Sequence, residues 1–200
     1  VVNEGRKVIN NIERVANLFV TKAAYAVLLT FAVGLLDSPF PFLHRQLTLI
    51  GTFSIGVPGF FLALAPEFDL IRPGFLRRVL WFSIPAGVIA GSATLAAYEA
   101  SLHIADIGLD KSRTLATVTL LTIGLVVLAV ASRPLRAWKL GLVVAMGAGY
   151  LVVFAVPWLR NYFELDLFWD PAWFYSAIAV AVAGVLIVAI PLVIPTRTRR

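Results

Sequence analysis

Two polar features lie inside long apolar stretches of this sequence, where residues able to do chemistry are unusual. Lys22 stands about seven residues inside the apolar stretch 15–36, which puts it roughly 10 Å deep at a helical rise of 1.5 Å per residue. In residues 48–59, Pro58 has no amide hydrogen, so in a helix the carbonyl of Ser54 loses its partner, and nearby glycines let the backbone bend or unwind. A freed carbonyl beside a hydroxyl is how interrupted helices make cation sites at mid-membrane.

Each feature also has a purely structural explanation. The ammonium of Lys22 could snorkel back to the cytoplasmic surface. The functional hypothesis is instead that Lys22 is a fixed positive charge beside an ion path, where it repels or releases a cation or neutralises a carboxylate. The proline could be a packing kink, since Gly and Pro are common in membrane helices. We take the following as candidates for a cation path: Thr21, Lys22, Tyr25, Ser54, Gly56 and Pro58. Ser54, through its backbone and hydroxyl oxygens, is the candidate metal ligand.

Composition places the chain in a membrane. Of its 200 residues 60% are hydrophobic and only 14% are charged, and the mean hydropathy is +0.90. Soluble domains carry about 25% charged residues, so an ordinary soluble domain is excluded. Cysteine is absent, which removes disulfides and thiolate metal sites from consideration. The sequence begins Val-Val without the pattern of a secretory signal peptide, and we expect it to be part of a longer chain.

Six apolar stretches have the length that a membrane-spanning helix needs. They cover residues 15–36, 47–65, 75–98, 114–132, 140–157 and 174–194. Short polar connections predict antiparallel neighbours, and no Gly or Pro interrupts the sequence between Gly5 and Gly34. The predicted fold is an all-α membrane protein, a six-transmembrane-helix bundle, in which residues 1–14 form a cytoplasmic stalk extension of the first helix and residues 15–200 form the transmembrane domain.

The distribution of charge predicts the orientation. If the N-terminus is cytoplasmic, that side collects twelve of the basic residues, whereas the other side receives four basic and seven acidic residues. Both termini are therefore expected in the cytoplasm, with the lipid bilayer of the plasma membrane as the surroundings. This asymmetry accounts for the net charge of +6, so the high pI gives no support to nucleic-acid binding.

The remaining polar and small residues have structural explanations. His44 and His103 stand alone in the expected outer loops, without a second ligand at metal-binding spacing. Gly87 and Gly91 form a small-xxx-small pair suited to helix packing. Residues 158–173 form an aromatic interfacial belt with a short surface helix. Four threonines of the fourth span are expected to hydrogen-bond to their own helix: Thr114, Thr117, Thr119 and Thr122.

Two stretches resemble the P-type cation-transporting ATPases. Residues 2–14, VNEGRKVINNIER, are similar to the point where the phosphorylation domain of that family ends and its fifth transmembrane helix begins as a stalk. Gly56-Val57-Pro58 is similar to the Gly-Leu-Pro segment of the sixth helix. The six spans match helices five to ten of the family. The resemblance rests on sequence motifs for residues 2–66 and on topology alone for the rest of the chain. It is closest to the calcium-transporting members from actinobacteria.

The resemblance implies the C-terminal, membrane-embedded part of an ATP-driven pump for calcium or another divalent cation. Liganding positions of calcium pumps would fall at the following residues: Ala23, Ala26, Gly51, Ser54 and Ile55. Only Ser54 keeps a ligand group, and neither helix supplies a carboxylate, so the missing fourth helix would have to provide the charge. Lys22 precedes a lost Asn position by one residue, and its ammonium could occupy the volume of a second cation and neutralise the site after release.

The resemblance also implies coupling to a phosphorylation domain. The coupling candidates are Glu4, Gly5 and Arg6 at the start of the stalk and Glu67, Asp69 and Arg72 in the loop after the second span. The chain itself contains no phosphorylation motif, and we expect no catalytic residue and no cofactor in it. For the complete enzyme the resemblance implies Mg and ATP. The partners of this chain would then be the rest of the pump, namely its first four helices and its actuator, phosphorylation and nucleotide domains, and the transported cation.

Two other functions remain as alternatives from the residues alone. A secondary transporter built from two inverted repeats would need a break in the fifth span to match Pro58, yet residues 141–156 contain no proline. A non-catalytic membrane scaffold would need neither a stalk nor an intramembrane lysine.

Overall fold

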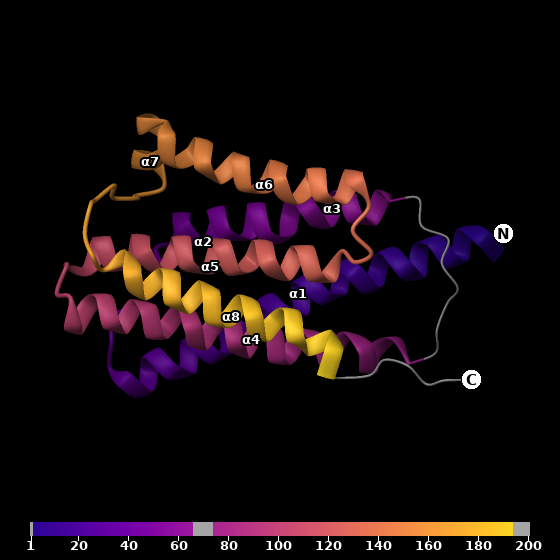
Figure 1. Cartoon of the computed structure of the whole chain (residues 1–200), viewed down its shortest axis with the longest axis horizontal. Coiled ribbons are helices and arrows are strands. Elements are labelled where there is room, and N and C mark those ends of the chain that lie inside the picture. The colour runs from indigo at the N-terminus through magenta and orange to yellow at the C-terminus, as the bar shows by residue number, and fades with distance from the viewer. Residues whose placement is uncertain (1, 66–73, 194–200) are drawn as a thin grey trace.

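The computed structural model describes residues 2–65 and 74–193, with side chains from residue 11 to residue 65 and from residue 74 to residue 192. In this part of the chain all regular structure is helical, and the long helices run up and down along one axis (Figure 1). The first helix begins and the last helix ends at the same end of the bundle (Figure 1). A chain that crosses the bundle an even number of times returns to the side from which it started.

The first helix, α1 (Val2–Leu36), is continuous over 35 residues. Its length follows from the sequence, because no helix-breaking residue occurs between its first turns and Gly34. The helix ends where Asp37 adopts a positive φ of 51° and two prolines follow in the connection. One rigid element therefore extends from beyond the apolar region to the far end of the bundle.

The second span consists of three consecutive pieces: α2 (His44–Gly51), the π-helix η1 (Thr52–Gly56) and α3 (Val57–Leu64). The helix begins at His44, so the connection covers residues 37–43 and is shorter than the sequence suggests. Gln46 explains the early start, because its side-chain oxygen accepts a hydrogen bond from the Leu43 amide at 3.0 Å. Its amide nitrogen donates to the Glu164 carbonyl at 3.0 Å, which keeps this buried polar residue paired.

The third and fourth spans are α4 (Phe75–Glu99), which continues as the π-helix η2 (Ala100–Ile104), and α5 (Leu109–Ala131). The expected polar connection from Glu99 is therefore helical as far as Ile104. The carboxylate of Glu99 accepts a hydrogen bond from the Ser38 hydroxyl and pairs with His103, both at 3.2 Å, which accommodates the charge at the helix end. Gly108 precedes α5 with a φ of 87°, a conformation that favours glycine.

The last part of the chain forms α6 (Ala137–Ala155), α7 (Pro157–Tyr162) and α8 (Trp173–Val193). The short helix α7 lies in the aromatic segment where the sequence predicts one. Pro157 begins it, as proline commonly does in the first turn of a helix. Phe168 stacks on Trp173 at a centroid distance of 4.9 Å, which fixes the chain as it enters α8.

The helices pack around α5. Of its most apolar 18-residue window 67% is buried, against 22–39% for the other described spans. Gly87 and Gly91 of α4 let α1 approach closely: a Cβ added to Gly87 would lie 2.5 Å from the Ala24 Cβ, and one added to Gly91 would lie 3.3 Å from the Tyr25 Cβ. The predicted small-residue packing is confirmed, and such close approach is the main way helices associate in lipid.

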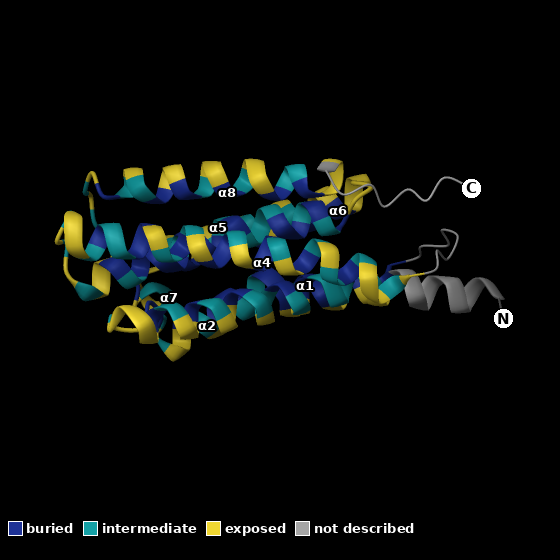
Figure 2. Ribbon diagram, turned by 90° about the horizontal axis from the view of Figure 1, so that it is seen from below, coloured by how far each residue is buried: buried dark blue, intermediate teal, exposed yellow. Residues whose placement is uncertain are grey.

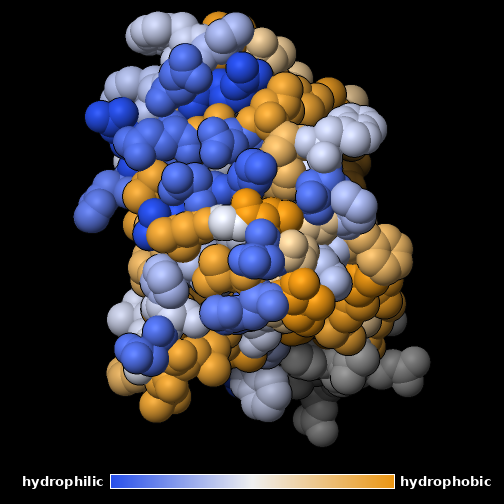
Figure 3. Space-filling view, turned by 90° about the vertical axis from the view of Figure 1, so that its left-hand side faces the viewer, coloured by the Kyte–Doolittle hydropathy of each residue, from blue (hydrophilic) through white to orange (hydrophobic). Residues whose placement is uncertain are grey.

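The outer faces of the bundle are apolar. Figure 2 shows exposed residues recurring along the outward sides of α8 and α4, and exposed side chains on these helices include Trp81, Val182 and Leu186. Six described helices are long and apolar enough to cross a membrane. The end of the bundle that carries α7 is rich in hydrophilic side chains (Figure 3). The all-α membrane bundle expected from the sequence is confirmed.

Candidate functional site

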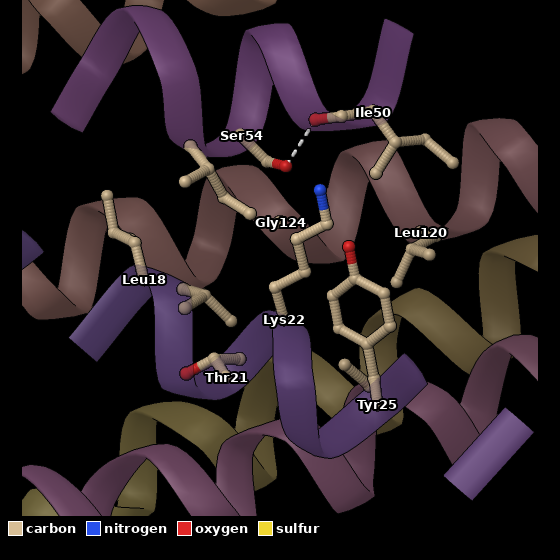
Figure 4. Close-up of a pocket in the computed structure, with 11 residues that line it drawn as sticks. Leu18, Thr21, Lys22, Tyr25, Ile50, Ser54, Leu120 and Gly124 are labelled. Carbon is tan, nitrogen blue, oxygen red and sulfur yellow. Dashed lines mark hydrogen bonds between the residues drawn. The ribbon is translucent and has the colours of Figure 1, made fainter. Parts of the chain in front are cut away.

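The side chain of Lys22 points to the middle of the second span. Figure 4 shows its amine directed at the helix break near Ser54 and the Ile50 carbonyl. Ser54 lies ten residues from each end of the span His44–Leu64, so the amine faces the centre of the bundle and not a surface. Gly51 makes room for it, because a Cβ at this glycine would lie 3.2 Å from Lys22 Nζ. The Lys22 side chain therefore does not snorkel to the cytoplasmic surface in this structure.

The helix break supplies polar backbone at the same depth. In η1 the hydrogen-bonding pattern changes register, and the Val57 amide bonds to the Thr52 carbonyl five residues earlier. Pro58 follows at once and cannot donate. The Ser54 hydroxyl donates to the Ile50 carbonyl, so the lone pairs of its oxygen are free to accept. The glycine on the facing helix, Gly124, lets α5 approach Ser54 closely, since a Cβ there would lie 3.0 Å from Ser54 Cβ.

A small cavity of about 20 Å³ lies between α1, the broken span and α5. Four of the residues that line it are polar, namely Thr21, Lys22, Tyr25 and Ser54. The volume is enough for about one water molecule. The polar ends of Lys22, Tyr25 and Ser54 point toward one another, whereas the Thr21 hydroxyl points away from them (Figure 4).

Several polar groups at the cavity lack partners. The hydroxyls of Thr21 and Tyr25 are buried and make no hydrogen bond. Lys22 Nζ has no hydrogen-bond or ion-pair partner among the described residues. A buried polar group without a partner costs about 1 to 3 kcal/mol, so such a cluster is unfavourable unless a ligand or a water satisfies it. The two unsatisfied hydroxyls, on residues that line the cavity beside the Lys22 amine, indicate a site suited to binding a polar ligand.

The other sequence candidates are not at the cavity. Gly56 and Pro58 do not line it, and they act only through the helix break. Glu4, Gly5 and Arg6 lie in α1, but their side chains are outside the described part of the structure. Residues 66–73, with the candidates Glu67, Asp69 and Arg72, are also outside the described residues.

Carboxylates are absent from the middle of the described bundle. The acidic side chains that the structure describes lie toward the ends of the bundle or in connections: Glu13, Asp37, Glu99, Asp106, Asp110, Glu164, Asp166 and Asp170. No group of three or more His, Asp or Glu side chains suited to a metal occurs among the described residues. Calcium takes six to eight oxygen ligands, carboxylates among them. The cavity offers only neutral oxygens and one cationic side chain, so it cannot bind a divalent cation by itself.

The structure adds a second group of polar contacts that the sequence did not single out. Asn11 is 3% exposed, and its side-chain amide donates to the carbonyls of Ala63 and Ala65 at 2.9 and 2.7 Å. Ala63 belongs to the last turn of α3 and Ala65 follows it directly, at the end where helices leave acceptors unpaired. The register 11, 14, 18, 21 and 25 puts Asn11 on the buried stripe of α1, and this spacing was the available signal.

Two residues further on, Glu13 joins α1 to the first turn of α4. Arg78 donates two hydrogen bonds to the Glu13 carboxylate, from Nε at 2.9 Å and from Nη2 at 2.7 Å. The two side chains are only 22% and 17% exposed, and bidentate pairs of this geometry are strong and directional. Since residues 66–73 connect α3 to α4, the chain on each side of that connection is fastened to the same turns of α1.

The polar residues of α5 and α6 have structural roles. All four threonines of α5 donate to the carbonyl four residues earlier, at 2.7 to 3.0 Å, as expected from the sequence. Lys139 is fully buried, and its Nζ donates to the carbonyls of Ser132 and Pro134 at 2.9 and 3.2 Å. It thereby pairs carbonyls just after the end of α5.

The fold and the cavity together define a multi-pass α-helical membrane protein with a broken helix at mid-membrane, an arrangement found in ion-transport proteins. A calcium-transporting ATPase named CtpE from Mycobacterium bovis is 43% identical over an alignment 197 residues long, which covers 92% of this chain and 25% of that protein. The protein of the same name from Mycolicibacterium smegmatis is 38% identical over an alignment 179 residues long, which covers 83% of this chain and 23% of the other. A probable cation-transporting ATPase, exp7 of Streptococcus pneumoniae, is 28% identical over an alignment 173 residues long, which covers 82% of this chain and 22% of the other.

These matches show that the chain belongs to the P-type cation-transporting ATPases, the family that the stalk motif and Gly56-Val57-Pro58 indicate. The chain spans about a quarter of the length of the curated relatives it matches. No family model matches it. The relationship therefore concerns the membrane part of these proteins.

Proposed function

We propose that this chain is the C-terminal membrane part of an ATP-driven cation pump, and that the cavity at Lys22 lies on its cation path. The observation that carries the proposal is the meeting of Lys22, Ser54 and two unpaired hydroxyls at a helix break in the middle of the bundle. The names of the relatives support active cation transport over a secondary transporter or a scaffold.

In this proposal the pump lies in the plasma membrane with the first and last helix ends in the cytoplasm. The described residues at that end of the bundle include Arg77, Arg133 and Arg136, whereas the opposite end carries most of the acids. This is the distribution that the positive-inside rule associates with a cytoplasmic side. The domains that bind Mg and ATP and become phosphorylated belong to the rest of the pump, as do the first four helices.

The transported ion is proposed to be calcium or another divalent cation. Ser54 and the backbone carbonyls at the break would provide neutral oxygens, and the carboxylates that such an ion needs would come from helices of the rest of the pump. Lys22 lies where a second cation would otherwise fit. Its charge would limit the site to one ion and favour release of that ion once the carboxylates turn away.

The magnitude of this effect can be estimated. A divalent cation about 6 Å from the Lys22 ammonium is repelled by roughly 5.5 kcal/mol at an effective dielectric constant of 20, which corresponds to about ten-thousandfold in an equilibrium constant. Removing the charge of Lys22 should therefore strengthen cation binding by up to about ten-thousandfold and slow release. Lys22→Met keeps most of the side-chain volume while removing that charge.

The test uses the complete pump reconstituted in vesicles, with vanadate-sensitive ATPase activity and cation uptake measured across divalent metals. Lys22→Met should lower the cation concentration for half-maximal ATPase activity, lower the maximal rate and change the number of ions moved per ATP. Lys111→Met is the matched control, because it makes the same chemical change in an exposed residue near the outer end of α5. Unaltered affinity and stoichiometry in Lys22→Met would reject the role of Lys22. An absence of any cation-stimulated ATPase activity in the wild type would reject the pump itself.

A further inference from the structure

A second, larger hollow lies on the lipid-facing side of the bundle. It has a volume of about 300 Å³ and runs along α5 between α6 and α8. The residues that line it are Thr122, Leu125, Val126, Ala129, Val130, Arg133, Leu135, Val143 and Val188. The volume is in the range of pockets that bind small ligands.

The groove has the depth of one membrane leaflet. The α5 residues that line it follow each other at alternating spacings of three and one, so they form one face of the helix from Thr122 to Val130. Eight residues at 1.5 Å each extend about 12 Å, close to half of the hydrocarbon core of about 30 Å. The single hydroxyl in this stretch, that of Thr122, donates to the Val118 carbonyl at 2.8 Å, so the groove offers a long apolar surface without unpaired polar atoms.

Arg133 lies at the end of the groove where the chain leaves α5. Its guanidinium is exposed and has no hydrogen-bond or ion-pair partner among the described residues. At this end of the described bundle the one acidic side chain is Glu13, which already pairs with Arg78. Arg136 is close by in sequence and also exposed, so the mouth of the groove is positively charged.

We infer that the groove binds one anionic phospholipid, with an acyl chain along α5 and the headgroup phosphate on Arg133. The bilayer supplies hydrocarbon along the whole length of the groove, and an unpaired guanidinium at headgroup level selects a negative headgroup over a zwitterionic one. Basic pockets between transmembrane helices bind anionic headgroups by this combination of contacts. The inference is independent of whether the chain transports a cation.

The test measures lipid binding to the complete purified protein by native mass spectrometry, with phosphatidylglycerol and phosphatidylcholine of identical acyl chains. A basic residue near a membrane surface contributes about 1 kcal/mol, so Arg133→Gln should reduce the preference for phosphatidylglycerol about fivefold. Arg136→Gln is the matched control, because that residue does not line the groove, and it should change the preference by less than twofold. Equal effects of the two variants would overturn the assignment of the headgroup to Arg133.

A second variant tests the acyl-chain half of the inference. Ala129→Trp places an indole in the groove from a partly exposed, lipid-facing position, and it should remove the most tightly bound lipid whatever its headgroup. Retention of that lipid would overturn the proposed location. Glycerol phosphate, which has the phosphate without the chain, should not compete; competition at similar concentration would show a plain anion site. If the wild type binds no lipid, the groove is covered by another helix of the pump, and the inference is overturned.

Discussion

The contact between α1 and α4 at Gly87 gives a prediction whose size follows from the structure. In Gly87→Ala the new Cβ would lie 2.5 Å from the Ala24 Cβ and 2.6 Å from the Thr21 carbonyl oxygen. Carbon atoms pack best at about 3.5 to 4.0 Å, so the two helices must separate by about 1 Å. Overpacking of this kind costs about 1 to 3 kcal/mol.

Gly184 on α8 provides the matched control. A Cβ added there would meet no atom within 4 Å, so Gly184→Ala tests the same change of residue without the steric conflict. Alanine favours a helix over glycine by about 1 kcal/mol, and both variants gain this contribution. We therefore expect Gly184→Ala to be neutral or slightly stabilised and Gly87→Ala to be destabilised, because only the second must move a neighbouring helix.

The assay is unfolding of the complete protein in mixed detergent micelles, followed by tryptophan fluorescence, with the thermal midpoint as a second measure. Because Gly87 also faces the backbone of Thr21 and Tyr25, separation of the helices would displace two of the residues that line the cavity. A lower cation affinity of Gly87→Ala should accompany its lower stability. The reasoning is refuted if Gly87→Ala and Gly184→Ala have the same free energy of unfolding.

Two further predictions concern polar contacts near the basic end of the bundle. Reversing one charge of the Glu13 and Arg78 pair should destabilise the protein by about 1.5 to 3 kcal/mol and lower the ratio of ions moved to ATP hydrolysed. Reversing both charges should restore part of the stability and part of that ratio. Additive losses in the double variant would contradict a direct coupling between α1 and α4. Lys139→Met should lower the free energy of unfolding by about 1 to 3 kcal/mol in the same assay, because it leaves the carbonyls of Ser132 and Pro134 unpaired. Lys111→Met changes an exposed lysine and should lower it by less. Equal losses in the two variants would show that burial of Lys139 is unimportant.

Much of the architecture could be predicted because a membrane imposes simple rules. An apolar stretch long enough to cross the bilayer must be helical, since backbone groups in lipid have to be paired within their own segment. This rule predicts the six long helices, the uninterrupted α1 and the short helix before α8. It fails at helix ends, where Glu99 and His44 are polar yet helical. Glu99 accepts a hydrogen bond from Ser38, and Gln46 in the first turn of α2 donates to the Glu164 carbonyl. Both partners come from distant segments, and the sequence does not show these pairings.

The sequence by itself determined which residues are unusual for their depth, namely Lys22, Ser54 and Pro58, because their chemistry conflicts with an apolar helix wherever it packs. Only the tertiary structure decided that Thr21, Lys22, Tyr25 and Ser54 surround one cavity, and that Pro58 does not line it. It alone showed that Asn11 and Glu13 fasten α1 to the last turn of α3 and the first turn of α4. The physical reason is that depth depends on position along one helix, whereas a site depends on the rotation and separation of several helices. Those are set by side-chain packing, such as that of Gly87 and Gly51, between residues far apart in the sequence.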